Sequence, residues 1–219
     1  MKIFIDSANL DDITKCFNTG LVDGVTTNPS LLAKAGMAPD YVYDRLVEMG
    51  VPDVSMEVWG TINEMEDEAM RLFTIYKEAA TIKLPMTPDG LEVCRRLEEK
   101  AIRTNVTLIF NAAQALLAAK SGATYVSPFV GRIDDQGYAG LEVVRSIAAL
   151  FAQHRVDTEV LAASIRTPHR AVRSFFNGAS IATLPPSVFW KMYEHVLTDV
   201  GLAIFDKDAE DIQTFPCAV

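Results

Sequence analysis

Short apolar runs alternate along the chain with longer segments in which apolar residues recur every three to four positions. The short runs have the length of buried strands, and the longer segments have the period of amphipathic helices. An N-capping residue followed by proline opens several of the helical segments, as in Thr87-Pro88 and Thr167-Pro168. The pattern predicts eight strands, each followed by a helix, at residues 3–6, 24–27, 54–58, 81–84, 105–109, 124–129, 159–163 and 180–184.

The order of these elements predicts a parallel sheet. No hairpin signal such as Asn-Gly lies between two strand runs, so the helices are expected to be the crossovers between parallel strands. A single (β/α)8 TIM barrel fits eight such units in 219 residues. A doubly wound open sheet is the alternative, but it usually carries a glycine-rich first turn that binds a nucleotide, and none is present.

We therefore predict one domain, residues 1–219, with residues from about 187 to 219 as a C-terminal helix and tail. The final helical region is expected to follow Pro185-Pro186 and to run through about Phe205. The segment 131–140 is rich in glycine and aspartate, and it is predicted as a loop.

Composition excludes several classes of function. Hydrophobic residues make up 49% of the chain, and the net charge of −9 argues against nonspecific binding to nucleic acid or to anionic membranes. Cys16, Cys94 and Cys217 are widely spaced and form no metal-binding pattern, so we expect reduced thiols and no metal. Asp6 interrupts the first apolar run, and no run approaches the roughly 20 apolar residues of a membrane span. A cytoplasmic protein with no membrane partner is expected.

Lys83 lies inside the apolar run TIKLP. Strand alternation places Ile82 and Leu84 on one face and Lys83 with Thr81 on the other. An ammonium group removed from water loses its proton more readily, and the neutral amine attacks a carbonyl to form a Schiff base. Alternatively, the side chain extends past the strand end to water.

Other polar residues help to decide between these two interpretations of Lys83. In a barrel of this type the chemistry lies at the carboxyl ends of the strands, and polar residues recur there: Asp6, Thr26, Asn28, Glu57, Asn105, Thr107, Ser127, Ser164 and Arg166. Each has an ordinary interpretation, such as a helix cap for Asn28 or a surface charge for Arg132 and Arg166. A barrel lumen has few inward positions, however, and so many polar residues there favour an active site.

The residue types indicate the chemistry. A lysine imine makes a bound ketose an electron sink, so that the adjacent carbon–carbon bond breaks, and Asp6 and Glu57 are the candidate acid/base groups. Alternation places Asn105 with Thr107, and Ser127 with Phe129, on the same side of their strands. Arg132 and Arg166 suit a substrate phosphate.

Four strings are specific enough to indicate a family: DGVTTNPSLLAKAG, TIKLPMTPDGLE, TNVTLIFNAAQALLAAKSGATYVSPFVGRIDD and LAASIRTPHR. With HVLTDVGLAIF near the end, the chain from Ile3 to about Phe205 resembles the small bacterial transaldolases. The resemblance implies a (β/α)8 barrel without metal or cofactor, and a homo-oligomer, pentamer or decamer, in which the C-terminal helix reaches a neighbouring subunit.

The resemblance also implies a reaction. A dihydroxyacetone unit moves from fructose 6-phosphate or sedoheptulose 7-phosphate to erythrose 4-phosphate or glyceraldehyde 3-phosphate, in the non-oxidative pentose phosphate pathway. Lys83 would form the imine, Asp6 would act on the sugar hydroxyl, and Glu57 with Thr107 would handle the catalytic water. Substrate contacts are expected from Thr26, Asn28, Asn105, Ser127 and Phe129, and phosphate contacts from Arg132, Ser164 and Arg166.

Two alternatives stay open. Fructose 6-phosphate aldolase, a relative that releases free dihydroxyacetone, typically has glutamine at position 57 and tyrosine at 129, so Glu57 and Phe129 favour transfer. A barrel kept as a binding or scaffold protein is the other alternative, and the intact acid/base positions argue against it. Three features depart from the family: Ser7 replaces a more usual threonine, the segment around Trp59 differs, and the tail after Asp206 is not basic.

Overall fold

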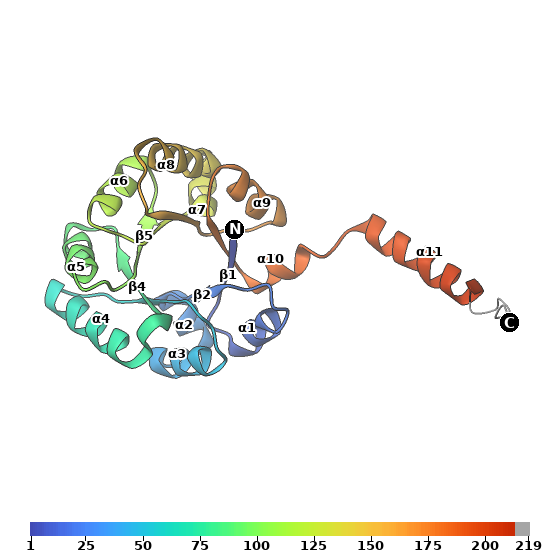
Figure 1. Ribbon diagram of the computed structural model, residues 1–219, viewed down its shortest axis with the longest axis horizontal. Coiled ribbons are helices and arrows are strands. Elements are labelled where there is room, and N and C mark those ends of the chain that lie inside the picture. The colour runs from blue at the N-terminus through green and yellow to red at the C-terminus, as the bar shows by residue number, and fades with distance from the viewer. Residues whose placement is uncertain (213–219) are drawn as a thin grey trace.

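The computed structural model describes residues 1–212, except for the side chain of Asp211. Its strands form a closed barrel in sequence order, in which each neighbouring pair is parallel, including β1 with β8 (Figure 1). The strands are β1 Lys2–Asp6, β2 Gly24–Thr26, β3 Val54–Glu57, β4 Ala80–Pro85, β5 Thr104–Ile109, β6 Tyr125–Pro128, β7 Glu159–Ala162 and β8 Ile181–Leu184. The predicted (β/α)8 barrel is confirmed, with strand bounds within about two residues of those expected.

Helices surround the barrel, except for the C-terminal one, which extends away from it (Figure 1). They are α1 Leu10–Phe17, α2 Pro29–Ala35, α3 Pro39–Glu48, α4 Ile62–Tyr76, the 3-10 helix η1 Lys77–Ala79, α5 Pro88–Glu98, α6 Ala112–Lys120, α7 Val130–Asp135, α8 Gly140–His154, α9 Pro168–Phe176, α10 Pro186–Lys191 and α11 Val196–Ile212. The predicted caps are confirmed for α5 and α9, where the side chains of Thr87 and Thr167 accept backbone N–H groups.

One helical prediction was wrong, and the structure adds detail to another. Part of the predicted loop 131–140 is the helix α7, because Val130 and Ile133, one helical turn apart, are buried against the barrel despite the glycines nearby. The predicted final helical region contains two helices, α10 and α11. α11 begins after His195, whose Nδ1 accepts the N–H of Leu197 at 3.1 Å and so caps the helix.

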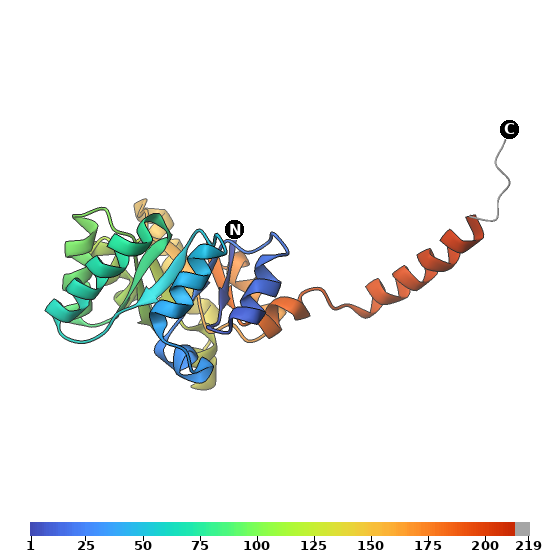
Figure 2. The same cartoon turned by 90° about the horizontal axis from the view of Figure 1, so that it is seen from below.

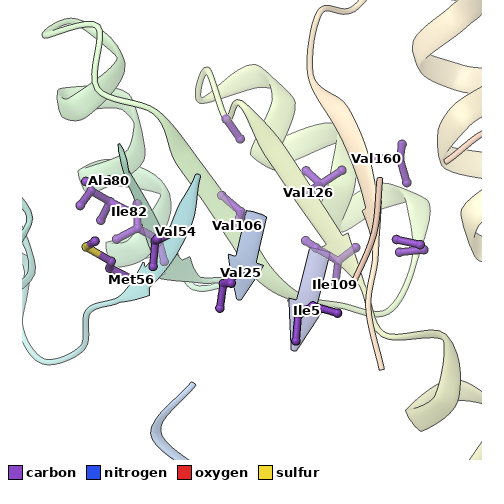
Figure 3. Packing of buried hydrophobic residues seen from close by; sticks show 14 of the residues in the cluster. Ile5, Val25, Val54, Met56, Ala80, Ile82, Val106, Ile109, Val126 and Val160 are labelled. Carbon is purple, nitrogen blue, oxygen red and sulfur yellow. The ribbon is translucent and has the colours of Figure 1, made fainter. Parts of the chain in front are cut away.

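The core has two parts. Apolar side chains on the outer faces of the strands, among them Ile5, Val25, Met56 and Val106, pack under the helices (Figure 3). Inside the lumen, the rings of Phe4 and Tyr125 pack edge to face, with their centres 6.4 Å apart. They belong to a cluster with Leu161, Ala163 and Ile181. Gly24 makes room for Phe4, because a Cβ there would lie 2.7 Å from its ring. The middle of the barrel is therefore filled.

A buried polar cluster closes the amino ends of the strands. Asp53 accepts hydrogen bonds from Thr81 Oγ1 and Tyr125 Oη, both at 2.8 Å, and from Arg103 Nη1 at 2.7 Å. Burial raises the pKa of the Asp53 carboxyl, while the Arg103 charge and these hydrogen bonds act in the opposite direction. The cluster joins the amino ends of the four neighbouring strands β3 to β6.

The C-terminal helix α11 extends away from the barrel (Figures 1 and 2). Its large apolar side chains are more than half exposed: Val196, Leu197, Val200, Leu202, Ile204, Phe205 and Ile212. Among residues 1–212, no helix combines the length and the apolar character needed to cross a membrane. Cys16 and Cys94 are buried free thiols, whereas Cys217 and the end of the predicted tail lie outside the described residues.

Candidate active site

Lys83 reaches into the lumen instead of extending to water. Its side chain is 6% exposed, and its Nζ donates a hydrogen bond to the main-chain oxygen of Thr27 at 2.9 Å. The same nitrogen lies 2.9 Å from Glu57 Oε2. Lys83 on β4 is paired in register with Glu57 on β3 and with Asn105 on β5, so the alternation predicted from the sequence places all three side chains inside the barrel.

A pocket of about 110 Å³ opens above Lys83 at the carboxyl ends of the strands. It is lined by Asp6, Thr26, Asn28, Lys83, Ser127, Phe129, Arg132, Leu161, Ala163, Ser164 and Thr183. Eight of the twelve predicted site residues are among them, contributed by strands or strand ends from around the barrel. The closed barrel thus brings together residues that are far apart in the sequence.

Asp6 is the second titratable group on the pocket wall. Thr26 Oγ1 donates to Asp6 Oδ1 at 2.8 Å and lies 2.7 Å from Thr183 Oγ1, so three adjacent strands share one chain of hydroxyl and carboxylate groups. Burial raises the pKa of the Asp6 carboxyl, the Lys83 charge and the Thr26 hydrogen bond lower it, and the Glu57 charge raises it further. A carboxyl group that holds its proton more firmly than usual is suited to acid/base catalysis.

Glu57 and Thr107 each carry a buried polar atom that has few partners among the described residues. Neither Glu57 Oε2 nor Thr107 Oγ1 makes a hydrogen bond to any described residue, although Glu57 Oε2 has the close charge of Lys83. Leaving a buried hydroxyl such as that of Thr107 unpaired costs about 1–3 kcal/mol, which stable structures rarely accept without a function. Leu108, next to Thr107, has φ 61°, and the β5–β6 register shifts between Val106 and Ile109. This bulge interrupts the regular alternation at Thr107.

The two predicted asparagines have different surroundings. Asn28 Oδ1 accepts the N–H of Leu31 and caps α2, which leaves its amide nitrogen available to the pocket that it lines. Asn105 is fully buried and does not line the pocket. Its Oδ1 accepts from Ser127 Oγ at 2.6 Å, and its Nδ2 donates to Ser55 Oγ at 3.1 Å. In this arrangement Asn105 orients Ser127, which does line the pocket.

The predicted phosphate residues lie on one side of the pocket. Arg132 lines it, with its guanidinium 5.0 Å from the centre of the Phe129 ring, and so does Ser164, whose φ is 57°. Arg166 does not line this pocket. It borders an adjacent pocket of about 840 Å³, which it shares with Arg132, and it is paired there with Asp135.

Comparison with known proteins identifies the family of the chain. The family model for Transaldolase/Fructose-6-phosphate aldolase matches residues 3–215. The chain belongs to this family. A probable transaldolase from Thermodesulfovibrio yellowstonii is 47% identical over 214 residues, which cover 97% of this chain and all of that protein. A probable transaldolase from Symbiobacterium thermophilum is 47% identical, over 96% of this chain and 97% of that protein. One from Nitrosopumilus maritimus is 46% identical, over 97% of this chain and 96% of that protein.

Sequence reasoning missed several residues that lie in or beside this candidate site. Thr27 contributes a main-chain oxygen, which no side-chain pattern reveals. Thr183 lies on β8 in the register expected for the lumen, so strand alternation alone would have identified it. Asp135 lies 31 residues before Arg166, and only the folded structure shows that they are paired.

The expected absence of a bound metal stays a prediction. Within the described part of the chain, no group of three or more His, Cys, Asp or Glu residues is placed to hold a metal ion.

Proposed function

We propose that this chain is a transaldolase that works through an imine on Lys83. It transfers a dihydroxyacetone unit from fructose 6-phosphate or sedoheptulose 7-phosphate to erythrose 4-phosphate or glyceraldehyde 3-phosphate, in the non-oxidative pentose phosphate pathway. The observation that carries the proposal is the buried Lys83 amine, placed between the Glu57 carboxylate and a pocket that also contains Asp6. Family membership and the names of the relatives support it.

Imine formation is the first step. The unprotonated Lys83 amine attacks the C2 carbonyl carbon of the ketose phosphate, and the carbinolamine loses its hydroxyl group as water to give a protonated imine. Glu57 Oε2, 2.9 Å from Nζ, is placed to take the amine proton and to pass a proton to the departing hydroxyl. Thr107, whose buried hydroxyl lacks a partner among the described residues, is proposed to hold the water that forms in this step.

Bond cleavage is the second step. Asp6 accepts the proton of the C4 hydroxyl while the C3–C4 bond breaks, and the electron pair of that bond moves into the imine to give an enamine on Lys83. The aldose phosphate leaves, and the acceptor aldehyde reacts with the enamine by the reverse sequence. Hydrolysis of the new imine then releases the product ketose and restores the amine.

Recognition of the substrate is proposed to involve the other polar groups of the pocket. The amide nitrogen of Asn28 and the hydroxyls of Thr26 and Ser127 would bind sugar hydroxyls, with Asn105 orienting Ser127. Arg132, Ser164 and Arg166 would take the phosphate, because guanidinium groups match its oxygens in pairs.

Release of free dihydroxyacetone is the second candidate activity. Phe129 on the pocket wall favours transfer, because its ring has no hydroxyl with which to protonate the enamine. The test incubates the enzyme with fructose 6-phosphate, with and without erythrose 4-phosphate, and measures sedoheptulose 7-phosphate and dihydroxyacetone. We expect turnover only with the acceptor. Steady formation of dihydroxyacetone without an acceptor would identify an aldolase, and absence of both products would favour a scaffold protein.

We also propose a cytoplasmic homo-oligomer, a pentamer or decamer. The support is α11, whose exposed apolar side chains need a covering surface, such as that of another copy. Light scattering on the intact chain and on a chain ending at Glu194 tests this. The expected result is a large assembly that is lost on truncation, and a monomeric intact chain would contradict it.

A further inference from the structure

The ion pair between Arg166 and Asp135 is placed where it affects phosphate binding. Nη1 and Nη2 of Arg166 each donate to a different carboxylate oxygen of Asp135. The arginine lowers the pKa of the Asp135 carboxyl through these hydrogen bonds. A phosphate group uses the same two-nitrogen edge of a guanidinium, so carboxylate and phosphate compete for Arg166.

The pair lies beside the pocket above Lys83. Arg166 and Asp135 border the adjacent pocket, and Arg132 lines both. The Arg166 side chain passes directly over Gly131, where a Cβ would lie 2.8 Å from Nε and 2.3 Å from the main-chain oxygen of Ser164. Arg166 is thus held close to Arg132 and Ser164, with its terminal nitrogens occupied by Asp135.

We propose that Asp135 occupies Arg166 until the phosphate of a substrate displaces it, so that Asp135 sets the affinity for phosphorylated sugars. The proposal rests on the proposed function. Phosphate carries about 1.5 to 2 negative charges against one on the carboxylate, and it also reaches Arg132, so it outcompetes Asp135. A neutral sugar hydroxyl carries no charge, so it does not displace Asp135 from Arg166.

Asp135 is free to move once it is displaced. It is the last residue of α7, its side chain is 44% exposed, and among the described residues only Arg166 donates a hydrogen bond to its carboxylate. Its neighbour Asp134 differs: it accepts the N–H of Gly140 at 3.0 Å and pairs with Arg170 at 3.2 Å. Asp134 therefore fixes the local fold, whereas Asp135 has one exchangeable partner.

The size of the effect follows from the exposure of the pair. An exposed ion pair of this kind changes an equilibrium constant by a factor of about 1.5 to 5. Asp135→Asn removes the competing charge and keeps the size of the side chain. It is expected to tighten binding of inorganic phosphate, and to lower the KM for fructose 6-phosphate, by about that factor.

The experiment measures binding of inorganic phosphate by titration calorimetry at fixed ionic strength. The variants are Asp135→Asn, Arg166→Ala and the double variant, with Glu142→Gln as the charge-matched control, because Glu142 forms an exposed pair with Arg145 at 3.6 Å. We expect tighter binding for Asp135→Asn, weaker binding for Arg166→Ala, no gain from Asp135→Asn in the Arg166→Ala background, and no change for Glu142→Gln.

Several results would overturn the proposal. Equal or weaker phosphate binding by Asp135→Asn would make Asp135 a residue that positions Arg166. An equal gain in phosphate affinity in the Arg166→Ala background, or in Glu142→Gln, would show that the gain comes from the change in net charge and not from release of Arg166. Phosphate binding needs no turnover, so failure of this proposal leaves imine formation at Lys83 untouched. Conversely, an enzyme without transferase activity that shows the expected binding pattern supports the competition and refutes only the proposed function.

Discussion

Glu57 provides the sharpest test of the acid/base assignment. Glu57→Gln keeps the volume of the side chain and one oxygen, but an amide cannot accept the proton that Lys83 loses on attacking the substrate. Acid/base groups typically contribute 10²-fold to 10⁴-fold to a rate. Glu57 lies 2.9 Å from Nζ, and its side chain is 16% exposed, so water replaces it in part. We therefore expect a loss of about 10²-fold to 10³-fold in kcat, equivalent to about 2.7–4 kcal/mol.

The assay has two parts. Transfer from fructose 6-phosphate to erythrose 4-phosphate is followed by coupled release of glyceraldehyde 3-phosphate, and the rate of imine formation by borohydride quenching in a single turnover. Both rates should fall, because Glu57 acts in forming and hydrolysing the imine. Glu68→Gln is the control, because this substitution removes the same charge on the outer helix α4, where Glu68 pairs with Arg71. Full transfer activity in Glu57→Gln would refute the role given to Glu57.

Two further predictions concern the ends of the barrel. Thr26→Val removes a hydrogen bond that lowers the pKa of Asp6, and Asp6 must be ionised to accept the C4 proton. The acid limb of kcat/KM should therefore move to higher pH, and an unchanged limb would exclude Asp6 as the titrating group. At the other end, Asp53→Ala leaves Arg103, Thr81 and Tyr125 without their acceptor. It should lower the free energy of unfolding by about 3 kcal/mol and Tm by about 6–12 °C with little change in kcat at 25 °C, and an unchanged Tm would contradict the stabilising role of the cluster.

The sequence predicted the barrel and the position of Lys83 for one physical reason. Strand alternation is a local property, and a closed parallel barrel converts it directly into inward and outward faces. Ser127 and Phe129 were therefore predicted on the same side, and both line the pocket. The same reasoning failed to anticipate the bulge beside Thr107, because a register shift depends on the neighbouring strand and not on the local pattern.

Contacts made by the main chain or across long separations could not be predicted. The Thr27 oxygen that accepts from Lys83 has no side-chain signature. The composition of α7 favours a loop, and burial of Val130 and Ile133 outweighed that preference. Arg166 was expected beside the substrate, and its pairing with Asp135 emerged only from the folded arrangement of α7 next to the end of β7.

The central claim is that Lys83 becomes covalently bound to the substrate. Borohydride reduction in the presence of fructose 6-phosphate, followed by peptide mass spectrometry, tests it most directly. A reduced three-carbon sugar unit is expected on Lys83 in the wild type and none in Lys83→Met, which should also lack turnover. A sugar adduct on another lysine, or no adduct in an enzyme that is active on fructose 6-phosphate, would contradict it.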